Sequence, residues 1–271
     1  MLRDITIGQY FPGFSPVHKM DPRMKIILVF VYIVVLFMSK NLMAVSVGVF
    51  FVFLCYIISK IPLNMIAKSL KPIIPIVIFT SILNMFFVET GDLVFKWGFI
   101  HIYTGGIMMS ILMSIRIICL IAGTGLLTYT TSPIALTDAI ERLLSPLKKV
   151  KVPVHEIAMM MTIALRFIPT LIEETEKIMS AQKARGADIE SGGIIDRAKA
   201  LIPILIPLFV SSFRRADELA LAMECRCYRG GEGRTRMKIL KCGAVDYIGL
   251  AVIIAFAAAV LTANQMLPSV F

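Results

Sequence analysis

Five long apolar runs constrain this chain more than any other feature of its sequence. Each run, counted with its flanks, has roughly the 17 to 25 residues that an α-helix needs to cross the hydrocarbon core of a bilayer. The runs are residues 24–38, 42–59, 73–88, 106–128 and 247–267. Hydrophobic residues make up 58% of the 271 residues and charged residues only 17%, a composition typical of integral membrane proteins. We therefore predict an all-α integral membrane protein with a bundle of about five transmembrane helices and a cytoplasmic or interfacial helical domain.

The distribution of lysine and arginine predicts the orientation of the chain. These residues are frequent before the first run and after the second, at Lys19, Arg23, Lys25, Lys60, Lys68 and Lys71, whereas the loop after the third run has a single lysine. Because short cytoplasmic loops carry the excess of positive charge, we expect the N-terminus to be cytoplasmic and the loop 89–103 to be external. Residues 1–25 show no cleavable signal peptide. We expect a multi-pass protein of the cell (plasma) membrane, embedded in the lipid bilayer.

Charge also divides the chain into four parts. Residues 1–23 are predicted to form a cytoplasmic N-terminal segment, 24–129 transmembrane helices 1 to 4, 130–245 a cytoplasmic domain, and 246–271 the C-terminal transmembrane helix. The 130–245 region holds 18 of the 28 basic residues and 13 of the 18 acidic ones, so we expect water to face much of it. Its apolar stretch 201–210 is broken by Pro203 and Pro207 and is too short to span, which predicts a place at the membrane interface.

Two stretches of the charged region repeat each other. When Arg185 is placed over Arg226, the stretch A-Q-K-A-R-G aligns with A-M-E-C-R-C, and Glu176 aligns with Asp217 at the same distance before each arginine. Chance similarity between two alanine-rich helices accounts for the pattern as well as a shared function does. In the functional interpretation, two similar helix ends on one chain would each present an arginine to a partner made of two similar subunits. Arginine suits such a contact because its planar, charged group makes several directed hydrogen bonds.

Cysteines flank the second arginine, but their spacing does not favour a metal site. Cys225 and Cys227 are two residues apart, so they cannot share one face of a helix, and the third thiol nearby is Cys242, with no histidine close to it. We interpret Cys225 and Cys227 as small side chains that allow close packing around Arg226. The Gly-Gly pair at 230–231 predicts the point where the helix stops.

The sequence lacks the common motifs of nucleotide and hydrolase chemistry. It has no Gly-Lys pair, which excludes a P-loop of the form G-x-x-x-x-G-K-[ST]. It also has no H-E-x-x-H, no G-x-S-x-G and no cysteine and histidine quartet. We therefore expect no catalytic residues, no bound cofactor and no metal in this chain.

Arg116 is the one charge within the run 106–128. An arginine in hydrocarbon is costly unless it faces the bundle interior or a partner. We favour a structural arginine bonded to backbone carbonyls or polar neighbours, and a contact with a partner or substrate is the alternative.

Five motifs then occur in a recognisable order along the whole chain. They are D-P-R-M-K at 21–25, L-R-F-I-P at 165–169, A-Q-K-A-R-G-A-D at 181–188, R-R-A-D-E-L-A-L-A-M-E at 214–224 and C-R-C-Y-R-G-G at 225–231. Together they resemble the transmembrane T component (EcfT/CbiQ family) of energy-coupling factor (ECF) transporters, which belong to the ABC transporters. The resemblance extends from near the N-terminus to the last apolar run.

The resemblance implies a scaffold that couples two ATP-binding-cassette ATPases to one or more membrane-embedded, substrate-binding S components, for uptake of vitamins or transition-metal ions. ATP would be bound by the ATPases, and no nucleic acid is among the implied partners. In the family, two x-Arg-x motifs end the coupling helices and dock into grooves on the ATPases. The matching residues here are Ala184, Arg185 and Gly186 in the first motif and Cys225, Arg226 and Cys227 in the second, which has cysteines where Ala and Gly are more usual.

Two other functions stay open on the sequence. The first is the T component of a dedicated cobalt or nickel importer, in which the substrate-binding subunit would be a fixed partner. The second is a membrane-embedded enzyme that uses Arg116, Glu156 and Arg166 on a lipid-linked substrate. These three residues include no nucleophile and no paired acid at a known spacing.

Overall fold

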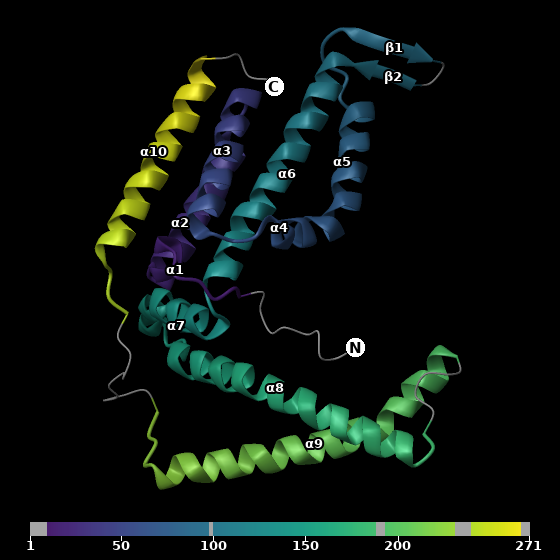
Figure 1. The fold of residues 1–271 in the computed structure, drawn as a ribbon, viewed down its shortest axis with the longest axis vertical. Coiled ribbons are helices and arrows are strands. Elements are labelled where there is room, and N and C mark those ends of the chain that lie inside the picture. Colours follow the sequence, from purple (N-terminus) through teal and green to yellow (C-terminus); the bar gives the residue numbers. More distant parts are fainter. Residues whose placement is uncertain (1–9, 98–99, 188–192, 231–239, 267–271) are drawn as a thin grey trace. The chain divides into compact units, whose positions relative to one another are not determined.

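The computed structural model describes residues 10–97, 100–187, 193–230 and 240–266, and helices dominate these residues (Figure 1). The helices are α1 (Pro16–Lys19), α2 (Pro22–Met38), α3 (Leu42–Ser59), α4 (Leu63–Leu70), α5 (Ile74–Phe87), α6 (Thr104–Thr130), α7 (Pro133–Leu143), α8 (Val154–Ala184), α9 (Ile194–Cys225) and α10 (Ala244–Met266). Short 3-10 helices cover Lys71–Ile73 and Ser145–Val150. The prediction of an all-α membrane protein is confirmed, with one addition. The antiparallel strands β1 (Leu93–Trp97) and β2 (Ile100–Tyr103) form a small hairpin that the sequence analysis did not predict.

Five helices are long and apolar enough to cross a membrane, by length and composition, within the part of the chain that the structure describes. They cover Leu42–Ser59, Asn64–Phe87, Thr104–Thr130, Val154–Ala184 and Ala244–Met266. Four of them overlap with predicted apolar runs. The run 24–38 forms α2, which has 17 residues and is shorter than any of the five. The fifth is α8, in the charged region, so its length was not anticipated from the sequence.

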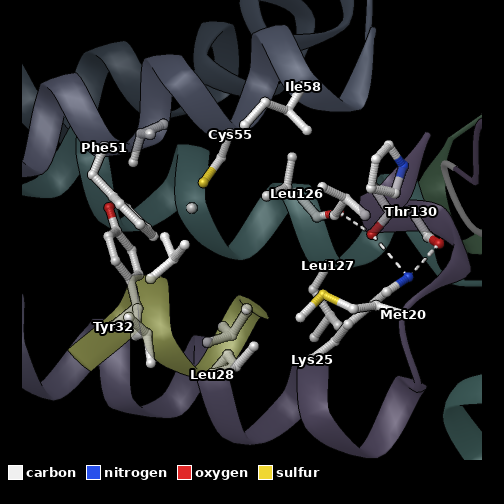
Figure 2. A pocket seen from close by; sticks show the side chains of 18 of the residues that line it. Met20, Lys25, Leu28, Tyr32, Phe51, Cys55, Ile58, Leu126, Leu127 and Thr130 are labelled. Atoms are coloured by element: carbon white, nitrogen blue, oxygen red, sulfur yellow. Dashed lines mark hydrogen bonds between the residues drawn. The ribbon is translucent and has the colours of Figure 1, made fainter. Parts of the chain in front are cut away.

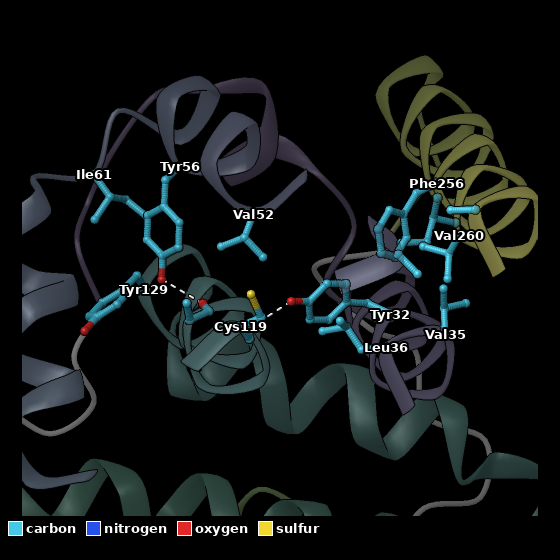
Figure 3. Close-up of a cluster of buried hydrophobic side chains, with 14 residues drawn as sticks. Tyr32, Val35, Leu36, Val52, Tyr56, Ile61, Cys119, Tyr129, Phe256 and Val260 are labelled. Carbon is cyan, nitrogen blue, oxygen red and sulfur yellow. Dashed lines mark hydrogen bonds between the residues drawn. The ribbon is translucent and has the colours of Figure 1, made fainter. Parts of the chain in front are cut away.

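The chain divides into two compact units. The bundle unit contains the described residues of 8–136 and 239–271, and the coupling unit contains those of 137–238. In the bundle unit, α2, α3, α6 and α10 surround a core of buried side chains that includes Tyr32, Leu36, Val52, Tyr56, Cys119, Phe256 and Val260 (Figure 3). The ring of Phe51 stacks with those of Tyr32 and Phe256, with 4.4 Å between the centroids of the two phenylalanines, and the rings of Tyr32 and Phe256 are tilted to each other.

Two tyrosines bind this core to the backbone of α6. The hydroxyl of Tyr32 donates to the carbonyl of Cys119 at 2.8 Å, and the hydroxyl of Tyr56 donates to the carbonyl of Ala122 at 2.8 Å (Figure 3). A buried tyrosine hydroxyl needs a partner, and a helix carbonyl supplies one because its oxygen has a second lone pair. Both contacts fix α2 and α3 against the same helix, α6.

Polar side chains also close the ends of helices in the bundle unit. The last carbonyls of a helix have no partner within it. The ammonium group of Lys25 donates to the carbonyl of Thr130, the last residue of α6, at 2.9 Å. The side-chain amide of Asn264 donates to the carbonyl of Met38, the last residue of α2, at 2.9 Å. Each contact joins a helix end to a second helix.

The D-P-R-M-K motif begins α2 and connects it to the start of α10. Asp21 caps the helix by accepting the backbone N–H of Arg23 at 2.9 Å, and its own N–H donates to Asp246 at 2.8 Å. Arg23 forms an ion pair with Asp21 at 2.6 Å and donates to the carbonyl of Leu240 at 3.3 Å. The hydrogen bond that Arg23 donates to Asp21 raises the pKa of the Arg23 guanidinium.

The close approach of Tyr32 to Gly123 gives a test of this packing. A Cβ atom at position 123 would overlap the Tyr32 ring, whereas one at position 125 would lie 3.4 Å from the Tyr56 hydroxyl, an ordinary contact. We expect Gly123→Ala to lower the free energy of unfolding by about 1–3 kcal/mol, because an overpacked core must shift. Thermal unfolding of the purified protein in detergent measures the effect, with Gly125→Ala as the matched control. Equal stability of the two variants would contradict the packing described.

Candidate functional site

The first predicted arginine caps the end of α8. Gly186 follows Arg185 with φ +84°, a left-handed conformation that glycine adopts without strain. The backbone N–H of Gly186 donates to Lys183 at 3.0 Å and that of Ala187 donates to Gln182 at 3.0 Å. This pair of bonds is the Schellman motif, which ends a helix by satisfying its last carbonyls.

The second arginine caps α9 with the same backbone geometry. Cys227 follows Arg226 with φ +55°, its N–H donates to Glu224 at 2.8 Å, and the N–H of Tyr228 donates to Met223 at 3.1 Å. The prediction that the Gly-Gly pair stops this helix is therefore wrong. The helix ends at Cys225, because Cys227 takes the left-handed position that glycine takes in the first motif. Gly230 lies beyond this turn, and Gly231 lies outside the described residues.

Both ends are open to solvent in the described part of the chain. Arg185 and Arg226 are exposed, and so are the four residues that flank them, Ala184, Gly186, Cys225 and Cys227. No atom of the described residues lies within 4 Å of the position that a Cβ would take on Gly186. Each arginine thus stands at an exposed helix end with backbone groups that are already bonded, so its side chain is available to a partner.

The helices α8 and α9 pack against each other in the coupling unit and run in opposite directions (Figure 1). The side-chain amide of Gln182 donates to the carbonyl of Pro203 at 3.2 Å. Glu174 accepts the hydroxyl of Ser211 and forms an ion pair with Arg215 at 2.8 Å. The interval from Glu174 to Gln182 on α8 equals the interval from Pro203 to Ser211 on α9. The two contacts therefore share one antiparallel register and lie about 12 Å apart along the pair.

Stretches of equal length separate the ion pair from the arginine at the end of each helix. The interval from Glu174 to Arg185 on α8 equals the interval from Arg215 to Arg226 on α9. With a rise of about 1.5 Å per residue, each arginine stands about 16 Å from the ion pair along its helix, and the opposite helix directions carry the two apart. The arginines are therefore separated by roughly 30 to 35 Å, one at each end of the helix pair.

Arg116 lies inside the bundle unit. Only 6% of its surface is exposed, and its guanidinium donates to the carbonyl of Ser39, the residue that caps α2. A second nitrogen lies 3.5 Å from the sulfur of Met113. The structure thus places this arginine against a helix end, in the same way as Lys25 and Asn264.

An apolar cavity of about 210 Å³ lies between α1, α2, α3, α6 and α10 (Figure 2). Among the described residues that line it, Lys25 is the one that carries a charge, and its ammonium group is bonded to Thr130 and Thr131. Arg116, Glu156 and Arg166 do not line this cavity. Glu156 is half-buried in the first turn of α8 and Arg166 is exposed. The cavity therefore does not assemble the residues of the enzyme alternative.

Sequence reasoning missed Gln182, Glu174 and Arg215. A signal for the first was present, because Pro203 and Pro207 are four residues apart, and a proline cannot donate to the carbonyl four residues before it. A polar side chain from another segment can then supply the missing donor. The identity of that side chain depends on the register of α8 against α9, which the hydrophobic pattern of the sequence does not specify.

The unusual turn at Cys227 gives a second test. A side chain with a Cβ at positive φ is strained, and a β-branched one more so. We expect Cys227→Gly to slow amide hydrogen exchange at positions 227 and 228 several-fold, because a left-handed non-glycine residue costs about 1 kcal/mol. For the same reason, we expect Cys227→Val to speed the exchange. Mass spectrometry of the exchanged protein measures both. The exposed neighbour Cys225 has helical geometry, so Cys225→Val is the control, and an equal effect there would contradict the assigned turn.

Comparison with known proteins gives extensive matches. The family model CbiQ, described as "Cobalt transport protein", matches residues 13–238. The chain is 56% identical to an "Energy-coupling factor transporter transmembrane protein EcfT" from Ruminiclostridium cellulolyticum over 256 residues, which cover 94% of this chain and 96% of that protein. It is 49% identical to the Bacillus subtilis protein of the same name, over 89% of this chain and 91% of that protein. A Clostridium kluyveri protein of the same name is 56% identical, with 92% of each chain covered.

Proposed function

Because this chain belongs to the family of transmembrane T components of energy-coupling factor transporters, we propose that it joins two cytoplasmic ATP-binding-cassette ATPases to a membrane-embedded S component. The chain supplies the membrane scaffold and the two docking ends. ATP is bound and hydrolysed by the partner ATPases, and the S component binds the substrate. The chemistry of transport thus takes place outside this chain.

The matched ends of α8 and α9 are the observation that supports this proposal. Both end in the same backbone motif, both expose an arginine, and the two stand at opposite ends of an antiparallel pair. A dimer of similar ATPases offers two similar grooves that are well separated, so one chain can meet both only if it carries two similar contacts at a distance. Arginine stays charged when such a contact excludes water and fits a groove lined by carboxylates or carbonyls.

The proposed mechanism is mechanical. ATP binding moves the two ATPases relative to each other, and each carries the helix end docked in it. The Glu174–Arg215 ion pair and the Gln182–Pro203 bond keep α8 and α9 in register, so displacement of either end is passed to the pair rather than lost in separation of the helices. The pair then acts on the S component.

Charge reversal at the two ends tests the docking. We expect Arg185→Glu and Arg226→Glu each to reduce the amount of ATPase that co-purifies with the chain at least tenfold, because a desolvated charged contact is often worth about 2–5 kcal/mol. Arg214→Glu is the matched control, since Arg214 is also exposed on α9 but lies well before the helix end. Co-purification in mild detergent, quantified against the chain itself, measures the effect. If the double variant retained both ATPases, the docking proposal would fail.

A cytoplasmic position of the coupling unit is part of the proposal. Cys225 and Cys227 are exposed, which makes them natural reporters of orientation. In a variant that retains only these two cysteines, expressed without partner subunits, we expect a membrane-impermeant maleimide to label inside-out vesicles and not intact cells. A single cysteine placed at Glu89, in the loop predicted to be external, should give the reverse pattern. Labelling of Cys225 and Cys227 in intact cells would reject this orientation.

Uptake of a vitamin or similar micronutrient is the substrate class that we propose. The transport of cobalt or nickel is the second candidate, favoured by the description of the matching family as a cobalt transport protein. Identification of the chains that co-purify with this protein distinguishes the two. A vitamin-binding S component supports the first, and a dedicated metal-binding subunit supports the second.

A further inference from the structure

Proline leaves one carbonyl of α9 without its helical partner. In an α-helix the carbonyl of residue 203 accepts the N–H of residue 207, and Pro207 has no N–H. A second proline, Pro203, likewise removes a bond one turn earlier. A helix that lacks two bonds of its ladder, one turn apart, bends there more easily than elsewhere. Residues 199–207 are therefore the natural bending point of this 32-residue helix.

Gln182 of α8 forms a hydrogen bond with α9 at this bending point. Its side-chain amide donates to the Pro203 carbonyl at 3.2 Å, which replaces the bond that Pro207 cannot make. The backbone carbonyl of the same residue accepts the N–H of Ala187 at 3.0 Å and that of Arg185 at 3.1 Å. One residue thus holds the cap that positions Arg185 and also the free carbonyl of the neighbouring helix.

The second motif has a different residue at the position of Gln182. In the alignment of the two motifs, Gln182 corresponds to Met223, whose thioether has no hydrogen to donate. The backbone turns match, but the side chains at this position do not. The turn that holds Arg185 therefore has a side-chain donor for the neighbouring helix, and the turn that holds Arg226 has none at the matching position.

We propose that Gln182 is the positioning residue through which displacement of the Arg185 end bends α9 at its prolines. The inference rests on the proposed docking of Arg185 to an ATPase and assigns a route for the motion after docking. Movement of Arg185 shifts Gln182 within the same turn of helix, and Gln182 carries the Pro203 carbonyl with it. The Arg226 end is joined to Pro203 along α9 itself and not through a side-chain donor, because Met223 stands where the first motif has Gln182.

The experiment measures the bend of α9 directly. Nitroxide labels at Ile195 and Leu221 lie on either side of the two prolines, and both side chains are exposed. The five native cysteines are replaced, with Cys225→Ala and Cys227→Gly to match the first motif. Pulsed electron paramagnetic resonance gives the distance between the labels in the complex purified with its ATPases, with and without ATP. We expect ATP to shift this distance in the otherwise unchanged chain.

Two variants at position 182 and one at position 207 test the route. Gln182→Met keeps the length of the side chain but removes the donor, and we expect it to reduce the population shifted by ATP about two- to tenfold, the value of one neutral hydrogen bond. Gln182→Lys retains a donor of similar reach and should keep most of the shift. Pro207→Ala restores an N–H to bond the Pro203 carbonyl, so Gln182→Met should add no further loss in that background. Glu174→Gln is the control, because it weakens the ion pair with Arg215 and leaves the Pro203 carbonyl unchanged. We expect its effect on the shift to be the same whether position 207 is proline or alanine.

The outcomes separate this inference from the docking proposal. Equal shifts in the Met and Lys variants would overturn the role of Gln182, and so would a loss from Gln182→Met that is unchanged by Pro207→Ala. If Pro207→Ala itself removes the bend, the comparison of Gln182→Met with Gln182→Lys still tests the role of Gln182. Retention of the ATPases by the Arg185→Glu variant would instead contradict the docking proposal, and this result is read from co-purification and not from the distance between the labels.

Discussion

Carbonyl groups without a donor in their own helix recur at several of the contacts that join helices in this structure. Helix ends and prolines leave such groups, and a donor from another helix can satisfy them. Lys25 bonds the end of α6, and Asn264 and Arg116 bond the end of α2. Gln182 bonds a carbonyl within α9. Each donor comes from a different helix, so the same bond that satisfies the backbone also fixes how two helices meet.

This requirement acts differently in the two units. In the bundle unit Lys25 and Arg116 are buried, and Tyr32 and Tyr56 add further bonds to α6 beside the aromatic rings of the core. Such a unit is suited to a fixed scaffold. In the coupling unit, α8 and α9 meet through polar contacts that are partly exposed, and large apolar side chains of α9 such as Phe209 and Phe213 remain exposed as well. Such a helix pair is suited to movement against other surfaces.

The sequence predicted the elements better than their connections. Apolar runs of sufficient length indicated four of the five candidate spans, and the aligned arginines indicated two similar helix ends, which are present as matching turns at Gly186 and Cys227. The stop of α9 was misplaced because glycine is the usual residue at a left-handed position, and here cysteine occupies it. The Glu174–Arg215 pair and the Gln182 bond could not be predicted, since both depend on the register between two helices, which hydrophobic periodicity leaves open.

The Glu174–Arg215 ion pair fixes the number of residues that separates each arginine from the point where the two helices are joined. Stretches of equal length separate the ion pair from Arg185 along α8 and from Arg226 along α9. One inserted or deleted residue in either stretch would rotate its arginine by about 100° around the helix axis and move it about 1.5 Å along it. The side chain would then face away from the groove into which we propose that it docks. Each stretch can therefore accept substitutions on its surface but not a change in its number of residues.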